Sequence, residues 1–209
     1  MTSAAGGDVQ RHGGAMSGNK RSDIVEAAAR IASESGIAAV TVRAVAARAG
    51  CGLGTLRHYF PAQHELIDAI LPHLLDQQLH DDGIDDTDRP RAARLATLMV
   101  QFLPPADDQD GDKMLSFWFE MSASALSVDA APGATRQLAI LTTRSHQRVR
   151  QWLRELAPER ADDVEWLEDT ADGLISLCSG LCLEALTPGS PVTLPRARHL
   201  LERAADRAF

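Results

Sequence analysis

The chain has few cysteines and no long apolar run. Three cysteines without regular, loop-rich spacing, Cys51, Cys178 and Cys182, exclude a disulfide-stabilised fold. The longest uncharged run of the C-terminal half, 173–183, is shorter than the roughly 17 to 25 residues of a membrane span. Residues 1–19 lack the apolar centre of a signal sequence. These absences predict a cytoplasmic protein that makes no use of a membrane.

Signals for strands and for catalysis are also scarce. Aromatic residues make up 4% of the chain, and Ala and Leu dominate over Val and Ile, which favours helices over sheets. A phosphate-binding loop ending in Lys-Ser/Thr, a His-Glu-x-x-His motif and a nucleophile elbow are all missing. The glycine run 50–54 follows a predicted helix, so it lacks the strand that precedes a dinucleotide-binding loop. The sequence predicts an all-α protein that is not an enzyme, with no cofactor and no metal site.

Charge is distributed unevenly along a chain whose formal net charge is -8. The segment 20–66 holds six Lys and Arg against four Asp and Glu, whereas 67–209 holds 14 against 24. A weakly basic segment on an acidic body is expected where only that segment contacts phosphate, the alternative being chance asymmetry in a soluble protein. Residues 1–19, rich in Gly, Ala and Ser without periodicity, are expected to form a disordered arm.

The segment 20–66 has the pattern of three short helices around one apolar centre. Ser22 and Thr41 are candidate N-caps, and Pro61 blocks continuation of the third helix. The turn 50–52, with its two glycines, separates the second helix from the third. The three helices are predicted at 22–35, 41–49 and 53–59, which is the arrangement of a helix-turn-helix domain.

The remainder, 67–209, is expected to form a larger helical domain. Pro and Gly breaks separate its apolar periodic segments, and Pro72 is expected to kink the helix that leads into it. Helices are predicted at 62–79, 90–103, 113–128, 134–156, 162–186 and 194–207.

The stretch 41–66, TVRAVAARAGCGLGTLRHYFPAQHEL, resembles the DNA-binding core of the tetracycline-repressor (TetR) family. The resemblance rests on Ala49-Gly50 at the end of the second helix and on Gly-Thr-Leu-Arg-His-Tyr-Phe at 54–60. The resemblance is close over about 22–71. Over the rest of the chain it consists of the helix count, the chain length and the segment Asp172-Gly173-Leu174. The resemblance implies a protomer of about nine helices, a homodimer built from helices 162–186 and 194–207, and a ligand pocket among the middle helices.

Three positions depart from the family pattern. Gly52 stands where a capping Ser or Thr is usual, Arg57 where Tyr is frequent, and Gln63 where Lys is frequent. A guanidinium at Arg57 compensates, because it offers phosphate charge-assisted bonds that a tyrosine hydroxyl lacks.

The residues expected to contact DNA lie at the start of the second helix and along the third. A hydroxyl and free amides at a helix start suit a phosphate oxygen, Gly54 allows close backbone approach, and Thr55 offers a methyl group and a hydroxyl to bases. Ordinary capping and solvated side chains are the alternative, and Leu56 and Phe60 are assigned to the core. The predicted DNA-binding residues are Thr41, Arg43, Gly54, Thr55, Arg57, His58 and Tyr59.

Wide, adaptable side chains of the larger domain suggest an effector pocket there, with a plain core stripe as the alternative. Cys178 and Cys182 are four residues apart and suit metal or redox chemistry in principle, but the sequence favours small hydrophobic residues at the dimer interface. The predicted pocket residues are Met99, Phe102, Met114, Phe117, Trp118, Met121 and His146.

These features predict a ligand-responsive transcriptional regulator. A homodimer is expected to bind double-stranded operator DNA with palindromic half-sites about 34 Å apart, and a small-molecule effector to release it, as a repressor. The alternative is a DNA-binding dimer without an effector.

Overall fold

The computed structural model describes residues 13–104, 119, 122–130 and 132–209, and the regular elements in these ranges are all helical. Packing divides the chain into an N-terminal unit, Met1–Leu74, and a C-terminal unit, Leu75–Phe209. Each unit has its own apolar core. The predicted all-α class, with a small N-terminal helical domain and a larger C-terminal one, is confirmed.

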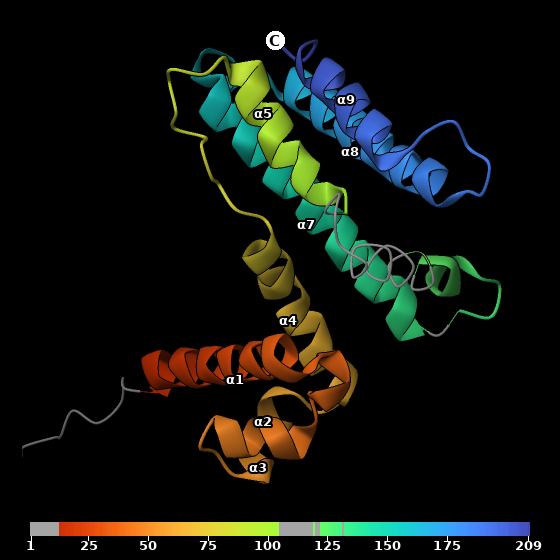
Figure 1. Cartoon of the computed structure of the whole chain (residues 1–209). Coiled ribbons are helices and arrows are strands. Elements are labelled where there is room, and N and C mark those ends of the chain that lie inside the picture. The colour runs from red at the N-terminus through yellow and green to blue at the C-terminus, as the bar shows by residue number, and fades with distance from the viewer. Residues whose placement is uncertain (1–12, 105–118, 120–121, 131) are drawn as a thin grey trace, which may run out of the picture. The chain divides into compact units, whose positions relative to one another are not determined.

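The N-terminal unit consists of short helices packed on one long one (Figure 1). Helix α1 begins at Gly13, so the predicted start at Ser22 is wrong. No proline lies between Gly13 and Ser22 to stop the helix, and extending a formed helix costs far less than nucleating one. Residues 1–12 of the predicted arm lie outside the described residues. The elements are α1 (Gly13–Ser35), η1 (Ile37–Ala39), α2 (Val42–Arg48), α3 (Leu53–Tyr59) and α4 (Gln63–Gln78) up to Leu74.

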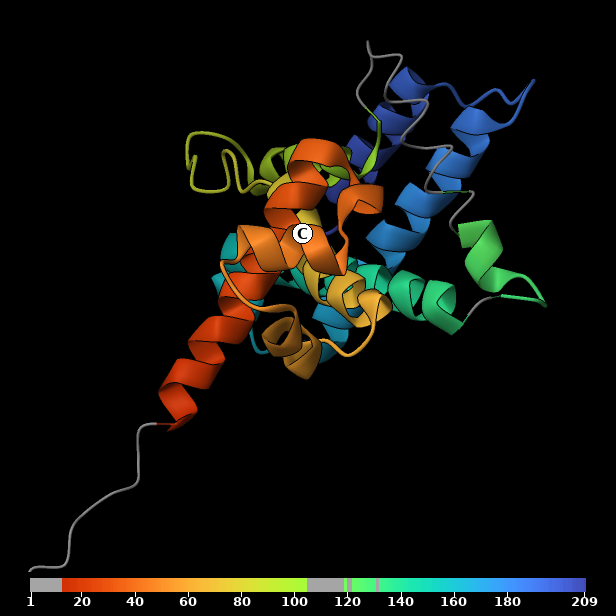
Figure 2. The same cartoon turned by 90° about the horizontal axis from the view of Figure 1, so that it is seen from below.

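The core of this unit forms between α1 and the three α-helices that follow it, α2, α3 and the first turns of α4. Figure 2 shows α1 along its length, and its inward face carries alanines that let α2 approach closely. Leu56 on α3 is fully buried and Phe60, just after α3, is 2% exposed, which confirms their assignment to the core. Burying one such side chain contributes about 1.5 to 3 kcal/mol. The opposite face of α3 is therefore the one that remains in solvent.

The turn between α2 and α3 depends on Gly50, whose φ is 57°. The Cys51 amide donates to the Ala46 carbonyl over 3.0 Å, and the Gly50 amide donates to the Ala47 carbonyl over 3.3 Å. Together these bonds form a Schellman motif, which satisfies the last carbonyls of α2. At the other end of α2, Thr41 accepts a hydrogen bond from the Ala44 amide over 3.2 Å, which confirms the predicted N-cap.

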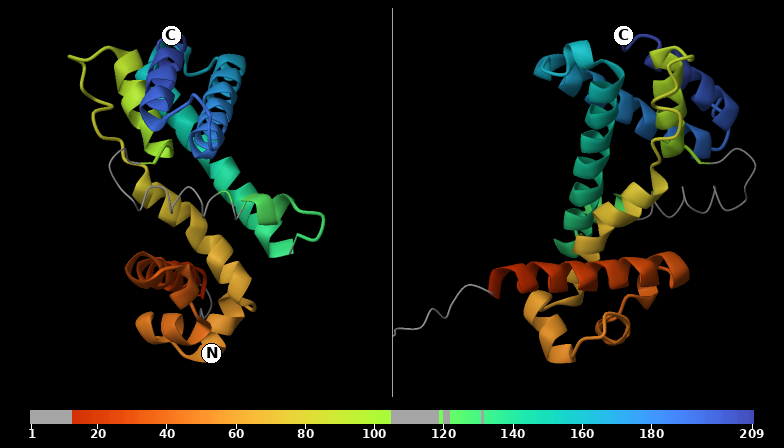
Figure 3. Two further views of the ribbon diagram at one scale, coloured as in Figure 1. Left: turned by 45° about the vertical axis from the view of Figure 1, so that its right-hand side comes forward. Right: turned by 90° about the vertical axis from the view of Figure 1, so that its left-hand side faces the viewer.

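The C-terminal unit is built around a long helix. Figure 3 shows α5, α8 and α9 gathered around the C-terminal half of α7, and α7 contributes the fully buried Trp152 and Leu153 to the shared core. Most of the predicted helix 113–128 lies outside the described residues, although 122–126 are helical. The elements are α5 (Arg91–Met99), η2 (Val100–Phe102), α7 (Pro132–Leu156), η3 (Pro158–Arg160), α8 (Val164–Leu186) and α9 (Leu194–Ala205).

One face of α7 fixes the end of α4 and the residues that follow it. Arg144 donates twice to the Asp76 carboxylate, over 2.9 Å from Nε and 2.5 Å from Nη2. One turn further, Arg148 donates to the Leu79 carbonyl over 3.2 Å, and after another turn Trp152 Nε1 donates to Asp81 over 2.6 Å. Residues four apart share one face of a helix. Segment 76–81 is therefore held against α7 at three successive turns.

Helix α4 continues through Pro72. Because proline has no backbone N–H, one intrahelical hydrogen bond, the one that would reach the Asp68 carbonyl, is lost at this turn. The same helix thus belongs to both units, with its first turns in the N-terminal core and its last residues in the C-terminal unit.

Replacing Gly50 with Ala should destabilise the N-terminal unit by about 1 to 2 kcal/mol, because a Cβ disfavours a positive φ. Gly54 is the matched control: it lies inside α3, and an added Cβ would meet nothing within 4 Å. Gly54→Ala should instead stabilise by about 0.5 to 1 kcal/mol through helix propensity. Urea unfolding followed by circular dichroism measures both. Equal effects of the two substitutions would contradict the role of the left-handed turn.

Candidate nucleic-acid interface

The predicted DNA-binding residues lie together on the outer surface of α2 and α3. Thr41 and Arg43 are exposed at the start of α2. On α3, Gly54, Thr55, Arg57 and His58 are exposed, and Tyr59 is half-buried. The Tyr59 ring meets the His58 ring edge-on, with centroids 5.2 Å apart and planes at 73°. The structure thus brings all seven onto two adjacent helices joined by the Gly50 turn.

The cations of segment 20–66, all of which the structure describes, differ in whether they have a partner. Arg30 pairs with Glu26, and Arg48 makes a two-pronged bond to Glu34. Lys20 Nζ donates to the Ala49 carbonyl over 3.1 Å, and the Arg21 guanidinium lies 5.0 Å from the centre of the Phe60 ring. Within this segment, Arg43 and Arg57 are the two cations for which the structure shows no ion pair, hydrogen bond or ring contact. Both lie on the exposed surface of α2 and α3, where phosphate has access to them.

The pair between Arg48 and Glu34 has a structural role. Its two bonds, 2.9 and 2.6 Å long, join the last turn of α1 to the last turn of α2. The hydrogen bond from Arg48 holds the pKa of Glu34 below its ordinary value, so the carboxylate stays ionised at neutral pH. The charge of Arg48 is thereby offset within the protein, unlike that of Arg57.

Two of the positions that depart from the family pattern take part in local structure. The Gln63 amide donates to the Val40 carbonyl over 3.0 Å, which fixes the start of α4 to the residue before Thr41. Gly52 is the N-cap of α3 in an extended conformation and supplies no side-chain cap. The sequence identified Gln63 only as a position where Lys is frequent in the family. Its hydrogen bond to Val40 could not be predicted, because the two residues are distant in the chain.

The structure separates the predicted pocket residues. Met99 is fully buried in the core, and Phe102 meets Trp152 edge-on with ring centroids 6.1 Å apart. His146 lies on α7 and its Nδ1 is 2.7 Å from an Asp172 oxygen on α8. Met99 and Phe102 lie side by side along α5 and η2, whereas His146 belongs to the contact between α7 and α8. The other four, Met114, Phe117, Trp118 and Met121, lie outside the described residues.

Cys178 and Cys182 belong to the protomer core. Their thiols lie 3.9 Å from the Met99 carbonyl oxygen and 3.6 Å from the Phe102 carbonyl oxygen. Burial raises the pKa of Cys182 to about 11 and raises the pKa of Cys178 further, so both thiols are protonated at neutral pH. The prediction that they are interface residues is wrong, because both pack inside one chain against the end of α5 and η2. Across the described residues, no group of three or more potential metal ligands occurs.

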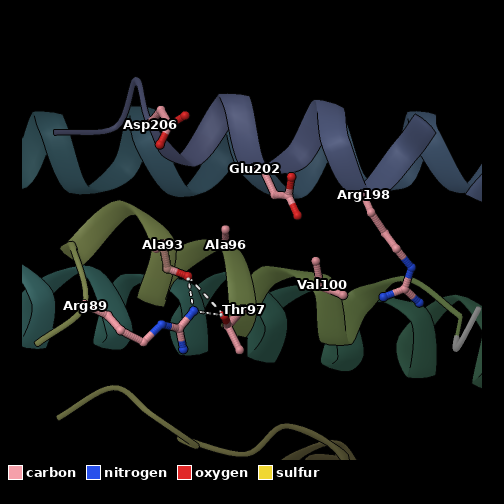
Figure 4. A pocket seen from close by; sticks show the side chains of 8 residues that line it. All are labelled: Arg89, Ala93, Ala96, Thr97, Val100, Arg198, Glu202 and Asp206. Atoms are coloured by element: carbon pink, nitrogen blue, oxygen red, sulfur yellow. Dashed lines mark hydrogen bonds between the residues drawn. The ribbon is translucent and has the colours of Figure 1, made fainter. Parts of the chain in front are cut away.

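The sequence pattern missed a groove between α5 and α9. Its volume is about 470 Å³, and small side chains of α5 form one wall while charged residues of α9 form the other (Figure 4). Its two walls are about 100 residues apart in sequence, so only tertiary packing creates it. The lining residues are Arg89, Ala93, Ala96, Thr97, Val100, Arg198, Glu202 and Asp206.

Among the helices that the structure describes, none combines the length and apolarity that crossing a bilayer requires.

The sequence matches known regulator families over most of its length. Residues 24–70 match the family model of bacterial regulatory proteins of the tetR family. Residues 90–209 match the model of the BetI-type transcriptional repressor C-terminal domain. The two matched regions correspond to the helix-turn-helix region and to most of the C-terminal unit.

Curated relatives match along most of the chain. The HTH-type transcriptional regulator BetI of Rhizobium meliloti (strain 1021) is 27% identical, over 88% of this chain and 86% of the relative. The HTH-type transcriptional regulator PksA of Bacillus subtilis (strain 168) is 26% identical, over 87% of this chain and 86% of the relative.

Solved structures share the fold. A putative TetR-family transcriptional regulator from Rhodococcus sp. matches with a TM-score of 0.54 and 21% identity, over 91% of this chain and 98% of that one. The multidrug binding protein EbrR, solved in complex with proflavin, matches with a TM-score of 0.52 and 23% identity, over 88% and 99%. The matched families, the relatives and the geometry of α2 and α3 agree: the chain belongs to the tetR family of bacterial regulatory proteins and is a DNA-binding transcriptional regulator.

Proposed function

We propose that the protein is a cytoplasmic repressor that binds a palindromic operator as a homodimer and leaves it when a small molecule binds the C-terminal unit. The DNA-binding part of the proposal rests on one observation: the guanidiniums of Arg43 and Arg57 have no partner among the residues that the structure describes and lie on the exposed surface of α2 and α3. The match to a BetI-type repressor C-terminal domain supports repression and the sensing role of the C-terminal unit.

In this proposal α3 enters the major groove and α2 lies against the backbone. The exposed Gly54 and Thr55 face the bases, because the buried Leu56 directs the opposite side of α3 inward. Arg43, Arg57 and the hydroxyl of Tyr59 contact phosphates, which fix the register of the protein on the duplex. Thr41 and His58 complete the contacts at the two ends of this surface.

The homodimer forms mainly through an exposed face of α8. Gly173, Ser176, Gly180 and Leu183 follow one another on this face, and Leu183 is 54% exposed. A Cβ added at Gly173 or Gly180 would meet nothing within 4 Å in the protomer, which leaves room for a second helix. Small residues permit such close approach of two helices around a two-fold axis.

Helix α9 contributes mostly polar groups to the dimer. Leu201 is fully buried in the protomer, so it is unavailable to a partner. The exposed residues of α9 include Arg196, His199, Glu202 and Arg203. We therefore assign the centre of the interface to α8 and its rim to α9.

Ligand and operator oppose each other because each favours a different geometry of the dimer. Helix α4 is the covalent connection, since it begins in the N-terminal unit and ends in the C-terminal unit. Its last residues are held by Arg144, Arg148 and Trp152 of α7. A ligand that displaces α7 thus displaces the end of α4.

Fluorescence-anisotropy titration against DNA from upstream of the protein's own gene tests the proposal, with and without a small-molecule library and at two salt concentrations. Competitor-resistant binding that a compound abolishes is the expected result. Specific binding that every compound leaves unchanged would favour a DNA-binding dimer without an effector. Absence of specific binding to upstream fragments and to genomic fragments selected by the protein would contradict the operator assignment.

Replacing Arg57 or Arg43 with Ala should weaken binding to duplex DNA and flatten its salt dependence. Each lost phosphate contact should reduce the slope of log K against log salt by about 0.9. Arg30→Ala is the control, because Arg30 is equally cationic but paired with Glu26 on α1. Titrations of a random duplex at several salt concentrations measure the slopes. A slope unchanged in Arg57→Ala, or changed equally in Arg30→Ala, would remove Arg57 from the phosphate contacts.

Replacing Gly180 with Glu should convert the dimer to a monomer, because a charged side chain would enter the closest part of the α8 contact. Val164→Glu is the control: Val164 is 60% exposed but lies on a different face of α8. Sedimentation equilibrium should give the monomer mass for Gly180→Glu and the dimer mass for Val164→Glu, with unchanged circular dichroism. A dimer that tolerates Gly180→Glu would place the interface elsewhere.

A further inference from the structure

The side chain of Leu53 is large and apolar, and the N-terminal unit does not use it for packing. It is 42% exposed. It belongs neither to the buried core of this unit nor to the partly buried side chains packed against that core. The other large apolar side chains that are exposed in the described part of the chain lie in the C-terminal unit: Leu126, Val128, Val164 and Leu183. The packing of the described residues therefore gives no reason for a leucine at this position.

Leu53 lies where a recognition helix reaches into DNA. It is the first residue of α3, and the N-terminal residues of such a helix contact base edges in the major groove. Its neighbours Gly52 and Gly54 have no side chains that could cover it. A Cβ added at Gly54 would meet nothing within 4 Å, so the surface beside Leu53 is open. Arg57 is four residues further along α3, and residues with this spacing share one face of a helix. Leu53 and Arg57 therefore face the same duplex.

The first turn of α3 lacks the side chains that read purines by hydrogen bonds. Arg and Lys bond to guanine in this way, and Asn and Gln bond to adenine. None of these residue types occurs at 53–55, where the sequence is Leu-Gly-Thr. The Thr55 hydroxyl can bond to several bases, so it distinguishes little by itself. In the major groove, the apolar feature of the bases is the C5 methyl group of thymine. The chemistry of this turn thus matches thymine.

Contact with a thymine methyl group would remove apolar surface of both partners from water. Such burial strengthens binding about fourfold for each methyl group. Uracil lacks this methyl group but keeps every hydrogen-bonding group of thymine. Replacing thymine with deoxyuridine therefore measures the contribution of the methyl group alone.

We propose that Leu53 reads the C5 methyl group of one thymine in each half-site of the operator, an inference that rests on the proposed function. Leu53 is then a specificity-determining residue, whereas Arg43 and Arg57 supply affinity that does not depend on sequence. The same methyl group occurs on 5-methylcytosine, so the experiment has to separate the two bases.

The probe is a duplex that the full-length protein selects from a random, unmethylated DNA pool. Each thymine of one half-site is replaced in turn with deoxyuridine, together with its symmetry mate, and fluorescence anisotropy measures Kd. We expect one pair of thymines whose replacement raises Kd about fifteenfold, because a factor of about four is lost in each half-site.

Leu53→Ala should bind the selected duplex about as weakly as the unchanged protein binds the deoxyuridine duplex, and should not discriminate between the two. A merely structural role of Leu53 would weaken binding to both duplexes equally and leave the ratio of their Kd values unchanged. Leu126→Ala is the matched control, because it removes a leucine that is 76% exposed in the C-terminal unit. This control should keep the full ratio. Circular dichroism should be the same for all three proteins.

Two results would overturn the proposal. Discrimination that persists in Leu53→Ala would assign the methyl contact to another residue. A specifically bound duplex in which no thymine is sensitive to deoxyuridine would show that α3 reads no thymine methyl group, and if methylation of a cytosine then strengthens binding, thymine is the wrong base. Failure to select any duplex would contradict the operator binding on which the inference depends, and it is distinguishable from these results because no sequence would then be enriched.

Discussion

The orientation of α3 depends on the left-handed turn at Gly50. The turn ends α2 with two backbone hydrogen bonds and starts α3 within three residues, so the direction of α3 follows from the geometry of this turn. The burial of Leu56 and Phe60 then determines which side of α3 faces the core. The turn sets the axis of the helix and the core sets its rotation. The turn and the core together place Gly54, Thr55 and Arg57 in solvent. A recognition helix needs such exposed residues to contact base edges and phosphates.

Electrostatics of the N-terminal unit complement this geometry. The formal excess of positive charge in 20–66 is small, and most of its cations stabilise the fold: Lys20 caps the C-terminal end of α2, and Arg48 ties α2 to α1. Because Lys20 and Arg48 bond within the protein, the guanidiniums of α2 and α3 that remain without a partner in the described part of the chain are Arg43 and Arg57. A weak net charge is thus compatible with a focused phosphate-binding surface, while the acidic remainder of the chain disfavours non-specific contact with DNA.

Local sequence signals predicted most of the N-terminal unit. The Thr41 cap, the Gly50 stop and the apolar spacing of Leu56 and Phe60 depend on near neighbours, so the pattern contains them. The local pattern does not contain contacts between segments that are distant in sequence. Gln63 bonds to Val40, and Cys178 packs against Met99 of the same chain and not against a second chain. The groove of Glu202 and Asp206 was missed for the same reason, because its apolar wall comes from α5. The early start of α1 was missed because no residue before Ser22 marks a helix boundary.

The contact between α7 and the end of α4 shows how a regulator of this fold can depend on a few polar side chains. The bonds from Arg144 to Asp76 have a fixed two-pronged geometry, and the Trp152 bond to Asp81 fixes a second point about two helical turns away along α7. Two fixed points along one helix prevent segment 76–81 from sliding or rotating independently of α7. Under the proposed mechanism, a displacement of α7 is therefore transmitted to α4 as a rigid shift. Pro72, where α4 lacks one hydrogen bond, precedes the fixed segment 76–81 in the chain. Any bending of α4 is therefore expected at Pro72 and not at the segment held by α7.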